Sequence, residues 1–511
     1  MIRGTQGCEV TVRHSEVLYQ GDLYVKSLRT AKATATYICK DGVQEYSPRF
    51  TYMGFRYIGI SGIAAKNIEV CAYALYSDIE NIGSFECSDE LLNQLQNNIV
   101  WGGKSNFIDI PTDCPQRDER MGWTGDISVF ARTACFNFDL SAFLNKWLRD
   151  VRYEQGHGGG IPLVVPKQGI SAPTVATACW GDSCILVPWA EYLARGDKQL
   201  LKAMYPTMKK FLKAVKFWAS LSGPGRYRRN IWKWLFQFGD WCAPEGGVMD
   251  WMKRGKWTAT AYYANSCAIV ARVARLLGEG KEAARYETLN RKISAAYRHV
   301  FTDGRGRLKN EFQTGYVLPL AFGLVKGEEK AKMAENLVRL IQKNGYHLST
   351  GFTGTPYLLF ALADTGHADA AYKILLQDTP PSWLYCVKQG ATTTWEEWTI
   401  DPCKEGNIPS YNHYAYGAVG DFLYRRVAGI EPLEGGYKKF RVKPVLDGGL
   451  TYAKASVKTP YGIASAQWKI EGNLFLLTVS VPVSAACEVI LPSGKKRIVK
   501  SGDITFTEVM V

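Results

Sequence analysis

Residues 88–101, SDELLNQLQNNIVW, mark the point where the sequence pattern changes from strand to helix. Ser88 and Asp89 are typical helix-capping residues, and the apolar residues after them fall three and four positions apart. Polar and apolar residues alternate before this stretch, and helical patterns dominate for about 340 residues after it. The change divides the chain into a small β domain and a large helical domain.

Strand-like alternation occupies both ends of the chain. Near the N-terminus, β-branched and aromatic residues alternate with polar ones between glycine breaks, in residues 10–19, 23–28, 33–40 and 49–62. The alternation returns in residues 440–445, 455–462, 464–470, 474–483 and 487–492. We expect a small β domain over residues 1–75 and a C-terminal β-sandwich over residues 428–511.

The central region, residues 76–427, has the apolar spacing of roughly a dozen helices. The clearest cover residues 124–138, 140–154, 181–195, 198–220, 259–278, 280–300, 313–324, 328–344, 354–366, 368–377 and 413–427. Long loops between so many helices favour an (α/α)6 barrel, because helical bundles connect neighbouring helices by short turns. The predicted fold is therefore multidomain and mainly α, with the barrel between the two β domains.

Charge alone is compatible with nucleic acid as a partner. The 511 residues include 62 basic and 48 acidic ones, a net charge of +14. However, residues 198–233 contain many lysines and arginines and no acid, and Lys202, Lys209, Lys213 and Lys216 recur there at helical spacing opposite apolar residues. This pattern predicts the solvated face of an amphipathic helix and not a nucleic-acid site.

Cysteine usage indicates a reducing compartment. The thirteen cysteines are an odd number without any C-x-x-C pair, which predicts neither a disulfide framework nor a zinc ribbon. Those expected to be small buried residues in apolar stretches are Cys39, Cys71, Cys135, Cys184 and Cys267. The start, MIRGTQGCEV, lacks the apolar segment of a signal peptide, and no apolar run is long enough to span a membrane. We expect a soluble, cytoplasmic protein.

Residues 109–126, DIPTDCPQRDERMGWTGD, have the composition of a sugar-cleaving site. They hold five carboxylates, two arginines and a tryptophan. Carboxyl groups set among arginines and other carboxyls acquire divergent pKa values, and glycosidases need one protonated carboxyl as the acid and one ionised carboxyl as the base. One of Asp113, Glu119 and Asp126 must be the acid if this site hydrolyses glycosides.

Four tryptophans of the helical region stand beside acids in loop sequences. These pairs are Trp123 with Asp126, Trp180 with Asp182, Trp241 with Asp240 and Trp395 with Glu396. A pyranose stacks its C–H face on an aromatic ring while its hydroxyls bond a carboxylate. A single pair of this kind is commonly part of a core, but four in one domain predict a shared sugar pocket.

The partner carboxyl has to come from another part of the chain. Inverting hydrolysis needs the two groups roughly 6.5–9.5 Å apart to admit water, and neighbours in sequence seldom face each other in this way. Residues 390–398, GATTTWEEW, supply Glu396 and Glu397, of which only one is expected to face the pocket. Composition does not choose between them. His413, in SYNHYAYG, suits a structural role as well as a hydroxyl contact.

Motifs for other chemistries are incomplete. HGGG at residues 157–160 resembles a hydrolase oxyanion loop, but no G-x-S-x-G nucleophile elbow accompanies it. GKS at residues 103–105 lacks the first glycine of a P-loop, and no H-E-x-x-H is present. We therefore expect neither a metal ion nor a cofactor.

Residues 109–126, 351–372, 390–398 and 410–425 share a recognisable family pattern. Their sequences, DIPTDCPQRDERMGWTGD, GFTGTPYLLFALADTGHADAAY, GATTTWEEW and SYNHYAYGAVGDFLYR, together resemble the bacterial α-L-rhamnosidases of glycoside hydrolase family 78. PRFTYMGFRYI resembles the β domain before the barrel in that family, and the segment from Gly429 resembles its C-terminal β domain. The resemblance implies a six-hairpin, inverting hydrolase that releases L-rhamnose from the non-reducing end of a rhamnoside.

The resemblance also implies roles for single residues. Glu119 matches the general acid of the family pattern, and Glu396 matches the general base. The remaining matches are two acids that hold sugar hydroxyls, three wall aromatics and a sugar-contacting histidine: Asp113, Asp126, Trp123, Trp180, Trp241 and His413.

One departure from the family pattern concerns the N-terminus. Family members usually carry further β domains ahead of the one that begins here, so aglycone preference and activity stay open, and missing strands would expose a sheet edge that favours a homo-oligomer. The alternatives are another (α/α)6-barrel exo-glycosidase or lyase, and a catalytically silent carbohydrate-binding protein. The expected ligand is a small-molecule or oligosaccharide rhamnoside, with no nucleic acid or membrane as a partner.

Overall fold

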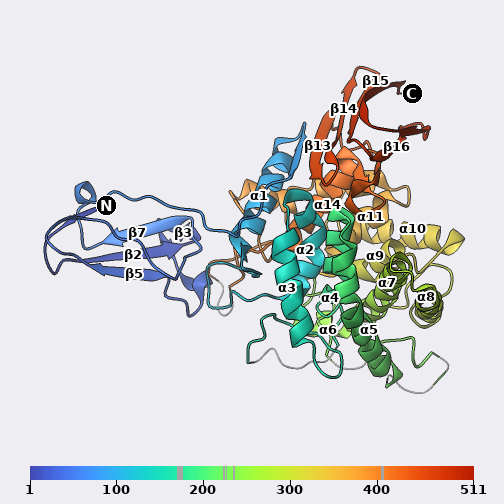
Figure 1. Ribbon diagram of the computed structural model, residues 1–511, viewed down its shortest axis with the longest axis horizontal. Coiled ribbons are helices and arrows are strands. Elements are labelled where there is room, and N and C mark those ends of the chain that lie inside the picture. The colour runs from blue at the N-terminus through green and yellow to red at the C-terminus, as the bar shows by residue number, and fades with distance from the viewer. Residues whose placement is uncertain (170–175, 222–224, 226, 234–235, 404–407, 511) are drawn as a thin grey trace.

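The computed structural model describes residues 1–169, 176–221, 225, 227–233, 236–403 and 408–510. Figure 1 shows a strand-rich N-terminal part at one side, a large helical body, and C-terminal strands that rise from that body. This order of β, helical and β parts confirms the predicted fold class.

The N-terminal part consists of short antiparallel strands. Its largest sheet has the order β5-β2-β7, and β1 pairs with β6 and β3 with β4. These elements are β1 Ile2–Gly4, β2 Glu9–Ser15, β3 Val17–Tyr19, β4 Asp22–Tyr24, η1 Lys26–Leu28, β5 Thr34–Ile38, β6 Gly42–Gln44, β7 Tyr57–Ser61 and η2 Ala65–Asn67. Of the strand predicted over residues 49–62, only β7 is strand. Gly54 instead packs against Gln116 of the helical body, so closely that a Cβ atom would come within 2.8 Å.

Two kinds of helix alternate along the helical body. Helices α2, α4, α7, α9 and α11 are buried over most of their length, whereas α3, α5, α8, α10 and α12 bury one face. The helices are α1 Glu90–Asn106, α2 Thr124–Asn137, α3 Ser141–Glu154, α4 Ser183–Arg195, α5 Lys198–Ser220, α6 Val248–Lys253, α7 Gly255–Leu276, α8 Gly280–Phe301, α9 Gln313–Ala321, α10 Gly327–Lys343, α11 Thr355–Ala363, α12 Ala368–Leu375, α13 Trp383–Lys388 and α14 Gly420–Phe422. Asp89 caps α1 as predicted, accepting the Leu92 N–H at 2.9 Å, but the helix continues past Trp101 to Asn106.

The buried helices form a closed ring. Along this ring α2 contacts α4, α4 contacts α7, α7 contacts α9 and α9 contacts α11. The helical segment η3 Ala415–Val419 contacts both α11 and α2 and completes the circle. The outer helices cover this ring from outside, which is the arrangement of an (α/α)6 barrel.

The last inner element is not the regular helix predicted for residues 413–427. It begins at Ala415 as a tight 3-10 turn, passes through α14, and ends as a wide π turn, η4 Leu423–Ala428. Gly417 and Gly420 lie so close to Phe130 and Thr133 of α2 that Cβ atoms would come within 3.0 and 2.5 Å of those side chains. Ring closure therefore depends on close approach at glycines, which hydrophobic spacing does not reveal.

The C-terminal strands form two sheets, in agreement with the predicted sandwich. Their orders are β11-β12-β16-β17 and β18-β15-β14-β13-β8. The strands are β8 Gly83–Cys87, β11 Ile430–Pro432, β12 Lys439–Val442, β13 Tyr452–Thr459, β14 Gly462–Glu471, β15 Leu474–Val481, β16 Ala486–Ile490, β17 Lys496–Val499 and β18 Gly502–Val509, with a helical turn η5 at Gly435–Tyr437. Strand β8 precedes the barrel in sequence and pairs antiparallel with β13, which ties the two ends of the barrel segment to one sheet.

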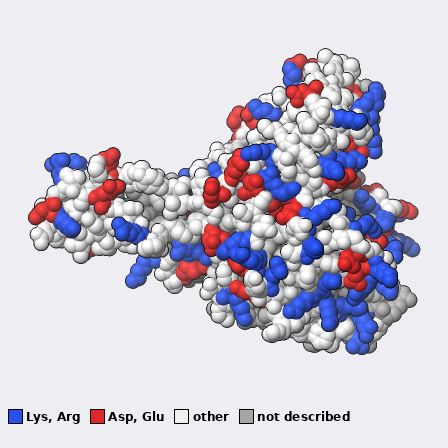
Figure 2. All heavy atoms as spheres, in the orientation of Figure 1, with Lys and Arg blue, Asp and Glu red and all other residues white. Residues whose placement is uncertain are grey.

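Helix α5 has the amphipathic character predicted for residues 198–220. Its apolar face is fully buried and comprises Leu201, Met204, Met208, Phe211 and Val215. Lys202, Lys213 and Lys216 are exposed on the opposite face, and Figure 2 shows basic side chains gathered over this part of the barrel. No helix of the described residues is both long and apolar enough to cross a bilayer.

All thirteen cysteines are free, and most are buried. The prediction of burial is confirmed for Cys39, Cys135, Cys184 and Cys267, but it is wrong for Cys71, which is exposed. Cys71 lies in a segment outside any strand, where Val70 and Tyr73 are 52% and 80% exposed. The apolar sequence around Cys71 is thus a surface segment and not a core strand.

Candidate active site

The acidic segment, residues 109–126, forms a closed loop between α1 and α2. After the short hairpin β9 Phe107–Ile108 and β10 Ile110–Pro111, the chain is irregular until α2 begins at Thr124. The Asp113 N–H donates to the Met121 carbonyl at 3.0 Å, and the Met121 N–H donates to Asp113 Oδ1 at 2.8 Å. These two bonds fix the ends of the segment that holds Arg117 and Glu119.

Arg117 connects the two glutamates implied as catalytic. Its side chain is 1% exposed, and its Nη2 lies 2.8 Å from Glu119 Oε2 and 3.2 Å from Glu396 Oε2. Its Nη1 donates to the Ile408 carbonyl at 3.3 Å. Two carboxylates from distant parts of the sequence therefore meet at one guanidinium group. The sequence analysis gave Arg117 no role, although a buried arginine among acids is the usual means of holding them together.

Glu396 is held in its ionised form. The Ser410 N–H donates to Glu396 Oε2 at 2.8 Å. Burial alone would raise the pKa of Glu396, but the charges of Arg117 and His413 and the Ser410 N–H together lower it below its ordinary value. Of the two glutamates that composition left open, Glu396 is the one whose carboxylate lies on Arg117.

Backbone pairing places Glu396 and His413 together. The Glu396 N–H donates to the Ser410 carbonyl at 3.0 Å, and the His413 N–H donates to the Thr394 carbonyl at 2.8 Å. The Thr394 hydroxyl donates in turn to the His413 carbonyl at 2.9 Å. Residues 394–396 and 410–413 therefore run side by side, and the position of either side chain depends on both segments.

Asp126 and His413 form a buried pair. Asp126 lies in the first turn of α2, and its Oδ1 is 3.0 Å from His413 Nε2. Burial alone would lower the pKa of His413, but the bond to Asp126 and the surrounding carboxylates raise it to about 9. The Ala415 N–H lies 3.4 Å from Nδ1, too far for a strong bond. His413 is thus protonated at neutral pH and adds positive charge beside Glu396.

Asp113 is buried with one oxygen bound and the other open. Oδ1 accepts the Met121 N–H, whereas Oδ2 has no hydrogen bond within the described residues and lies 3.9 Å from Arg117 Nη2. Burial, followed by the charge of Glu119, raises the pKa of Asp113 to about 7. A buried oxygen without a partner is costly, and a sugar hydroxyl that donated to Oδ2 would remove that cost.

The three predicted wall tryptophans converge on Phe238. The ring of Trp180 stacks on Phe238 at 4.1 Å between centroids, and Trp241 and Trp123 meet it edge-on at 5.3 and 6.5 Å. The indole N–H groups of Trp123 and Trp180 have no hydrogen-bond partner in the part of the chain that the structure describes. Sequence reasoning missed Phe238 because it paired acids with tryptophans only, although Asp240 follows Phe238 at the spacing by which Asp182 follows Trp180.

Two acids of the tryptophan pairs are structural. Asp182 accepts hydrogen bonds from the Cys179 N–H at 2.8 Å and from the Ser266 hydroxyl. Asp240 accepts from Thr353 Oγ1 at 2.8 Å, from the Gly354 N–H at 3.2 Å and from the Thr314 hydroxyl. Since both oxygens of each carboxylate are bound within the protein, these acids fix the loops that carry Trp180 and Trp241.

The N-terminal β domain also contributes to the cluster. Arg29 Nη1 lies 2.7 Å from Glu119 Oε2. Glu16 is 4% exposed, and burial raises its pKa to about 8 although the charge of Arg117 acts in the opposite direction. Sequence reasoning missed both residues, since nothing in a strand pattern shows that its loops meet another domain.

Three potential metal ligands lie at the same place. One ligand atom each of Asp113, Cys114 and Glu119 lies within 4.8 Å of the others. Arg117 Nη2 is 2.8 Å from Glu119 and 3.9 Å from Asp113, so a guanidinium group already supplies the positive charge that a cation would bring. The donor set fits an arginine-bridged carboxylate site better than a metal centre.

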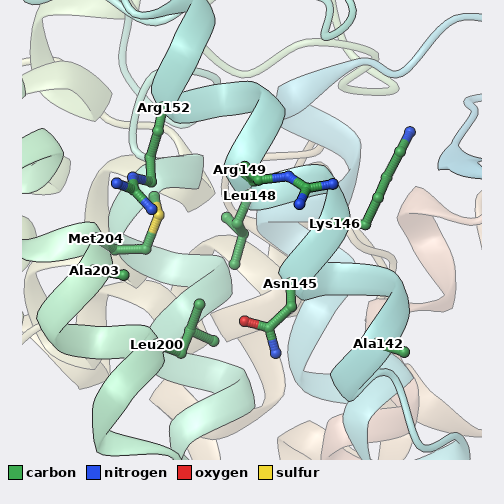
Figure 3. A pocket seen from close by; sticks show the side chains of 9 residues that line it. All are labelled: Ala142, Asn145, Lys146, Leu148, Arg149, Arg152, Leu200, Ala203 and Met204. Carbon is green, nitrogen blue, oxygen red and sulfur yellow. The ribbon is translucent and has the colours of Figure 1, made fainter.

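One hollow on the barrel exterior has no acid–base pair. It measures about 420 Å³ and lies between α3 and α5, where Lys146, Arg149 and Arg152 lie beside apolar residues (Figure 3). A second hollow of about 360 Å³, between α5 and α8, is also lined by basic residues. Neither contains a carboxylate among its lining residues, which separates both from the glutamate site.

Sequence families match three consecutive parts of the chain. The model described as bacterial alpha-L-rhamnosidase 6 hairpin glycosidase domain matches residues 80–427. The bacterial alpha-L-rhamnosidase concanavalin-like domain matches residues 1–76, and the bacterial alpha-L-rhamnosidase C-terminal domain matches residues 429–505. The matches extend over almost the whole chain.

Characterised proteins with the same architecture are similar in sequence and structure. An alpha-L-rhamnosidase of Formosa agariphila is 39% identical over 98% of this chain and 54% of its own length. The crystal structure of an Aspergillus terreus alpha-L-rhamnosidase has a TM-score of 0.92 at 36% identity, covering 99% of this chain and 60% of that one. The Streptomyces avermitilis alpha-L-rhamnosidase complexed with L-rhamnose has a TM-score of 0.89 at 36% identity, covering 99% and 50%. The chain spans about half the length of the curated relatives it matches.

Proposed function

The chain belongs to the bacterial α-L-rhamnosidase family, and we propose that it hydrolyses terminal α-L-rhamnosides with inversion at the anomeric carbon. The observation that supports this most directly is the meeting of Glu119 and Glu396 on Arg117. Glycoside hydrolysis needs one carboxyl group to protonate the leaving oxygen and another to act on water. This chain brings two such groups to one buried arginine.

Glu119 is proposed as the general acid. Its Oε2 contacts Arg29 and Arg117, while its Oε1 has no hydrogen bond to any described residue, and the side chain is 20% exposed. Oε1 is therefore free to hold a proton and to donate it to the glycosidic oxygen as the bond to the anomeric carbon breaks.

Glu396 is proposed as the general base. Arg117, His413 and the Ser410 N–H favour its carboxylate form. A base has to be ionised before water arrives, and Glu396 would accept the proton of that water as its oxygen attacks the anomeric carbon. Both catalytic groups then end in the opposite protonation state, and proton exchange with solvent restores them.

The remaining site residues are proposed to hold the rhamnose ring. The open Oδ2 of Asp113 suits a sugar hydroxyl, and the Asp126–His413 pair offers a second polar contact. Trp123, Trp180 and Trp241 are proposed to form an aromatic wall, in which the indole N–H groups of Trp123 and Trp180 have no partner among the described residues. The relative solved with L-rhamnose supports this sugar as the one recognised.

Inversion at the anomeric carbon is proposed from family membership. Both Oε2 atoms contact the same Arg117 nitrogen, at 2.8 and 3.2 Å, and so lie no more than about 6 Å apart, which is shorter than the roughly 6.5–9.5 Å typical of inverting pairs. The reacting oxygens are the two Oε1 atoms, whose separation the shared contact does not fix. Product analysis therefore has to decide this part of the proposal.

We also propose the domain boundaries 1–75, 76–427 and 428–511, which the three family matches support. The active site then draws on two of these domains, because Arg29 belongs to the first and Glu119 and Glu396 to the second. The proposed substrate is a small-molecule or oligosaccharide rhamnoside.

The test is hydrolysis of p-nitrophenyl α-L-rhamnopyranoside followed by proton NMR of the first-formed sugar. We expect β-L-rhamnose before mutarotation. Appearance of α-L-rhamnose first would keep the activity and reject inversion. Release from p-nitrophenyl β-glucoside but not from the α-L-rhamnoside would indicate a different exo-glycosidase. Tight rhamnoside binding by calorimetry without turnover would indicate a silent binding protein.

A further inference from the structure

The β domain contacts the barrel at the two segments that hold the glutamates. Tyr24 donates its hydroxyl proton to the Pro402 carbonyl at 2.9 Å, and Arg56 donates to the Gly390 carbonyl at 3.0 Å. From the barrel, Arg120 donates to the Tyr52 carbonyl at 3.2 Å, and its guanidinium lies 5.0 Å from the Tyr52 ring. Residues 116–120 and 390–403 therefore form the barrel side of this contact, with Glu119 in the first segment and Glu396 in the second.

Arg29 lies at the centre of this contact. Its Nη1 is 2.7 Å from Glu119 Oε2, and its side chain is 26% exposed. Its neighbour Thr30 bonds Asp118 Oδ2 through the hydroxyl, and through the backbone N–H at 3.4 Å. Residues 29 and 30 of the β domain therefore contact residues 119 and 118 of the loop that precedes α2.

The backbone of Arg29 has an unfavourable conformation. Its φ is 55° and its ψ is −116°, directly after the turn η1. A residue with a Cβ atom rarely adopts a positive φ, and such strain persists where the surrounding contacts hold it. Strain of this kind is concentrated at functional sites, which makes the contact with Glu119 a better explanation than a turn formed by chance.

The two arginines on Glu119 differ in what else they bind. Arg117 Nη2 is shared among Glu119, Glu396 and Asp113 at 2.8, 3.2 and 3.9 Å. Arg29 forms an ion pair with Glu119 alone among the described residues. Arg117 therefore binds the acid and the base alike, whereas Arg29 binds the acid alone, and its charge makes only a small, more distant contribution to the lowered pKa of Glu396.

We propose that Arg29 is a positioning residue of the active site: by holding Oε2 of Glu119 from the β-domain side, it orients Oε1 toward the leaving-group oxygen. This inference rests on the proposed function and extends it, because it makes the β domain part of the catalytic apparatus. Glu119 is 20% exposed, so a carboxyl held by Arg117 alone would be free to rotate out of line with the glycosidic oxygen. Poor alignment lowers the rate of proton transfer.

The experiment compares leaving groups in the Arg29→Gln variant. A 2,4-dinitrophenyl α-L-rhamnoside leaves with little help from an acid, whereas an alkyl α-L-rhamnoside needs proton donation. We expect kcat of Arg29→Gln to fall by about tenfold or more on the alkyl rhamnoside and by no more than about threefold on the dinitrophenyl rhamnoside. Arg29→Lys keeps the charge and should recover part of the loss.

Arg56→Gln is the matched control. It removes an arginine contact of the same domain with the barrel, at Gly390 and not at Glu119. We expect both substrates to be hydrolysed at near wild-type rates by this variant. Thermal unfolding of all variants establishes that the rates refer to folded protein.

Two results would overturn the inference. Equal losses on the two substrates would make Arg29 a docking contact of the β domain, and unchanged rates on both would leave it without a role in catalysis. If Arg29→Gln does not fold, the same comparison in Arg29→Lys decides the question by the same criteria. A wild-type protein inactive on every rhamnoside would overturn the proposed function and this inference with it, whereas an active wild type with an insensitive Arg29→Gln overturns the inference alone.

Discussion

Five carboxylates of the barrel fall into two groups that differ in their hydrogen bonds. Asp182 and Asp240 have both oxygens bound by hydroxyl and backbone N–H groups of the protein. Asp113, by contrast, leaves Oδ2 without a bond within the described residues, and Glu119 and Glu396 each use one oxygen only. The oxygens of the first group are all bound within the protein, whereas each member of the second group keeps one oxygen without a bond to the described residues.

The number of hydrogen bonds at each oxygen separates the structural acids from those proposed to react, and the sequence does not make this distinction. All five residues lie in sequence segments rich in acids and tryptophan. The four tryptophan–acid pairs cannot be told apart from the sequence. A satisfied carboxylate stabilises the loop around it, whereas a buried oxygen left without a partner is costly unless a ligand supplies one. Counting the bonds of each oxygen therefore assigns function more sharply than counting acids.

The largest expected effect is on turnover, from Glu119→Gln and Glu396→Gln. Each change keeps size and polarity but removes the proton transfer, so kcat on p-nitrophenyl α-L-rhamnopyranoside should fall by about a hundredfold or more while the unfolding temperature is kept. Glu397→Gln is the control for Glu396, since it alters the adjacent carboxyl. Near wild-type rates for both Glu119→Gln and Glu396→Gln would end the assignment of these acids as reactive.

A smaller effect is expected on substrate binding, from Asp113→Asn. The amide oxygen can still accept the Met121 N–H, but an NH2 group replaces the open Oδ2. Loss of a charged hydrogen bond to a sugar hydroxyl should raise KM by about tenfold or more with little change in folding. A variant with unchanged KM but a lower unfolding temperature would place Asp113 in the structural group instead.

A third effect, on stability, is expected from Asp240→Ala. The change leaves the Thr314 and Thr353 hydroxyls and the Gly354 N–H without their shared acceptor, so the free energy of unfolding should fall by about 1–3 kcal/mol. The rate per folded molecule should stay within about threefold of the wild type. Asp240→Asn, which still accepts a bond, should lose less. A greater loss of kcat in Asp240→Ala than in Asp113→Asn would break the division between the two groups.

A last effect, confined to the pH dependence of stability, is expected at Glu16, which resembles the open group although no reaction step uses it. Its oxygens have no well-formed hydrogen bond within the described residues, and burial raises its pKa from 4.5 to about 8. The folded protein therefore binds more protons than the unfolded chain between those values, and its stability is full below pH 4.5 and falls as the pH rises to about 8.

Glu16→Gln removes this dependence because the amide does not ionise. The variant should match the wild type in thermal unfolding at pH 4.5 and unfold at a higher temperature at pH 8, by roughly 4 °C. An identical pH dependence of unfolding in both proteins would show that Glu16 is already ionised at its place against the barrel.

Local patterns predicted the elements far better than their contacts. The cap at Asp89, the amphipathic α5 and the alternating strands of the sandwich each depend on neighbours in sequence, and each is present. The regular helix over residues 413–427 and the burial of Cys71 were wrong, because close approach at Gly417 and Gly420 and the course of residues 70–76 depend on distant parts of the chain.

Sequence by itself predicted the parts of this protein: a β domain, a ring of helices, a β-sandwich, and the acids and tryptophans expected to form a sugar site. The tertiary structure alone decided which of them meet. It brought Arg117 between Glu119 and Glu396, gathered three tryptophans on Phe238, and placed Arg29 of another domain on the candidate acid. The physical reason is that residue type and spacing set local conformation and burial, whereas hydrogen bonds between distant segments exist only after the ring of helices has closed.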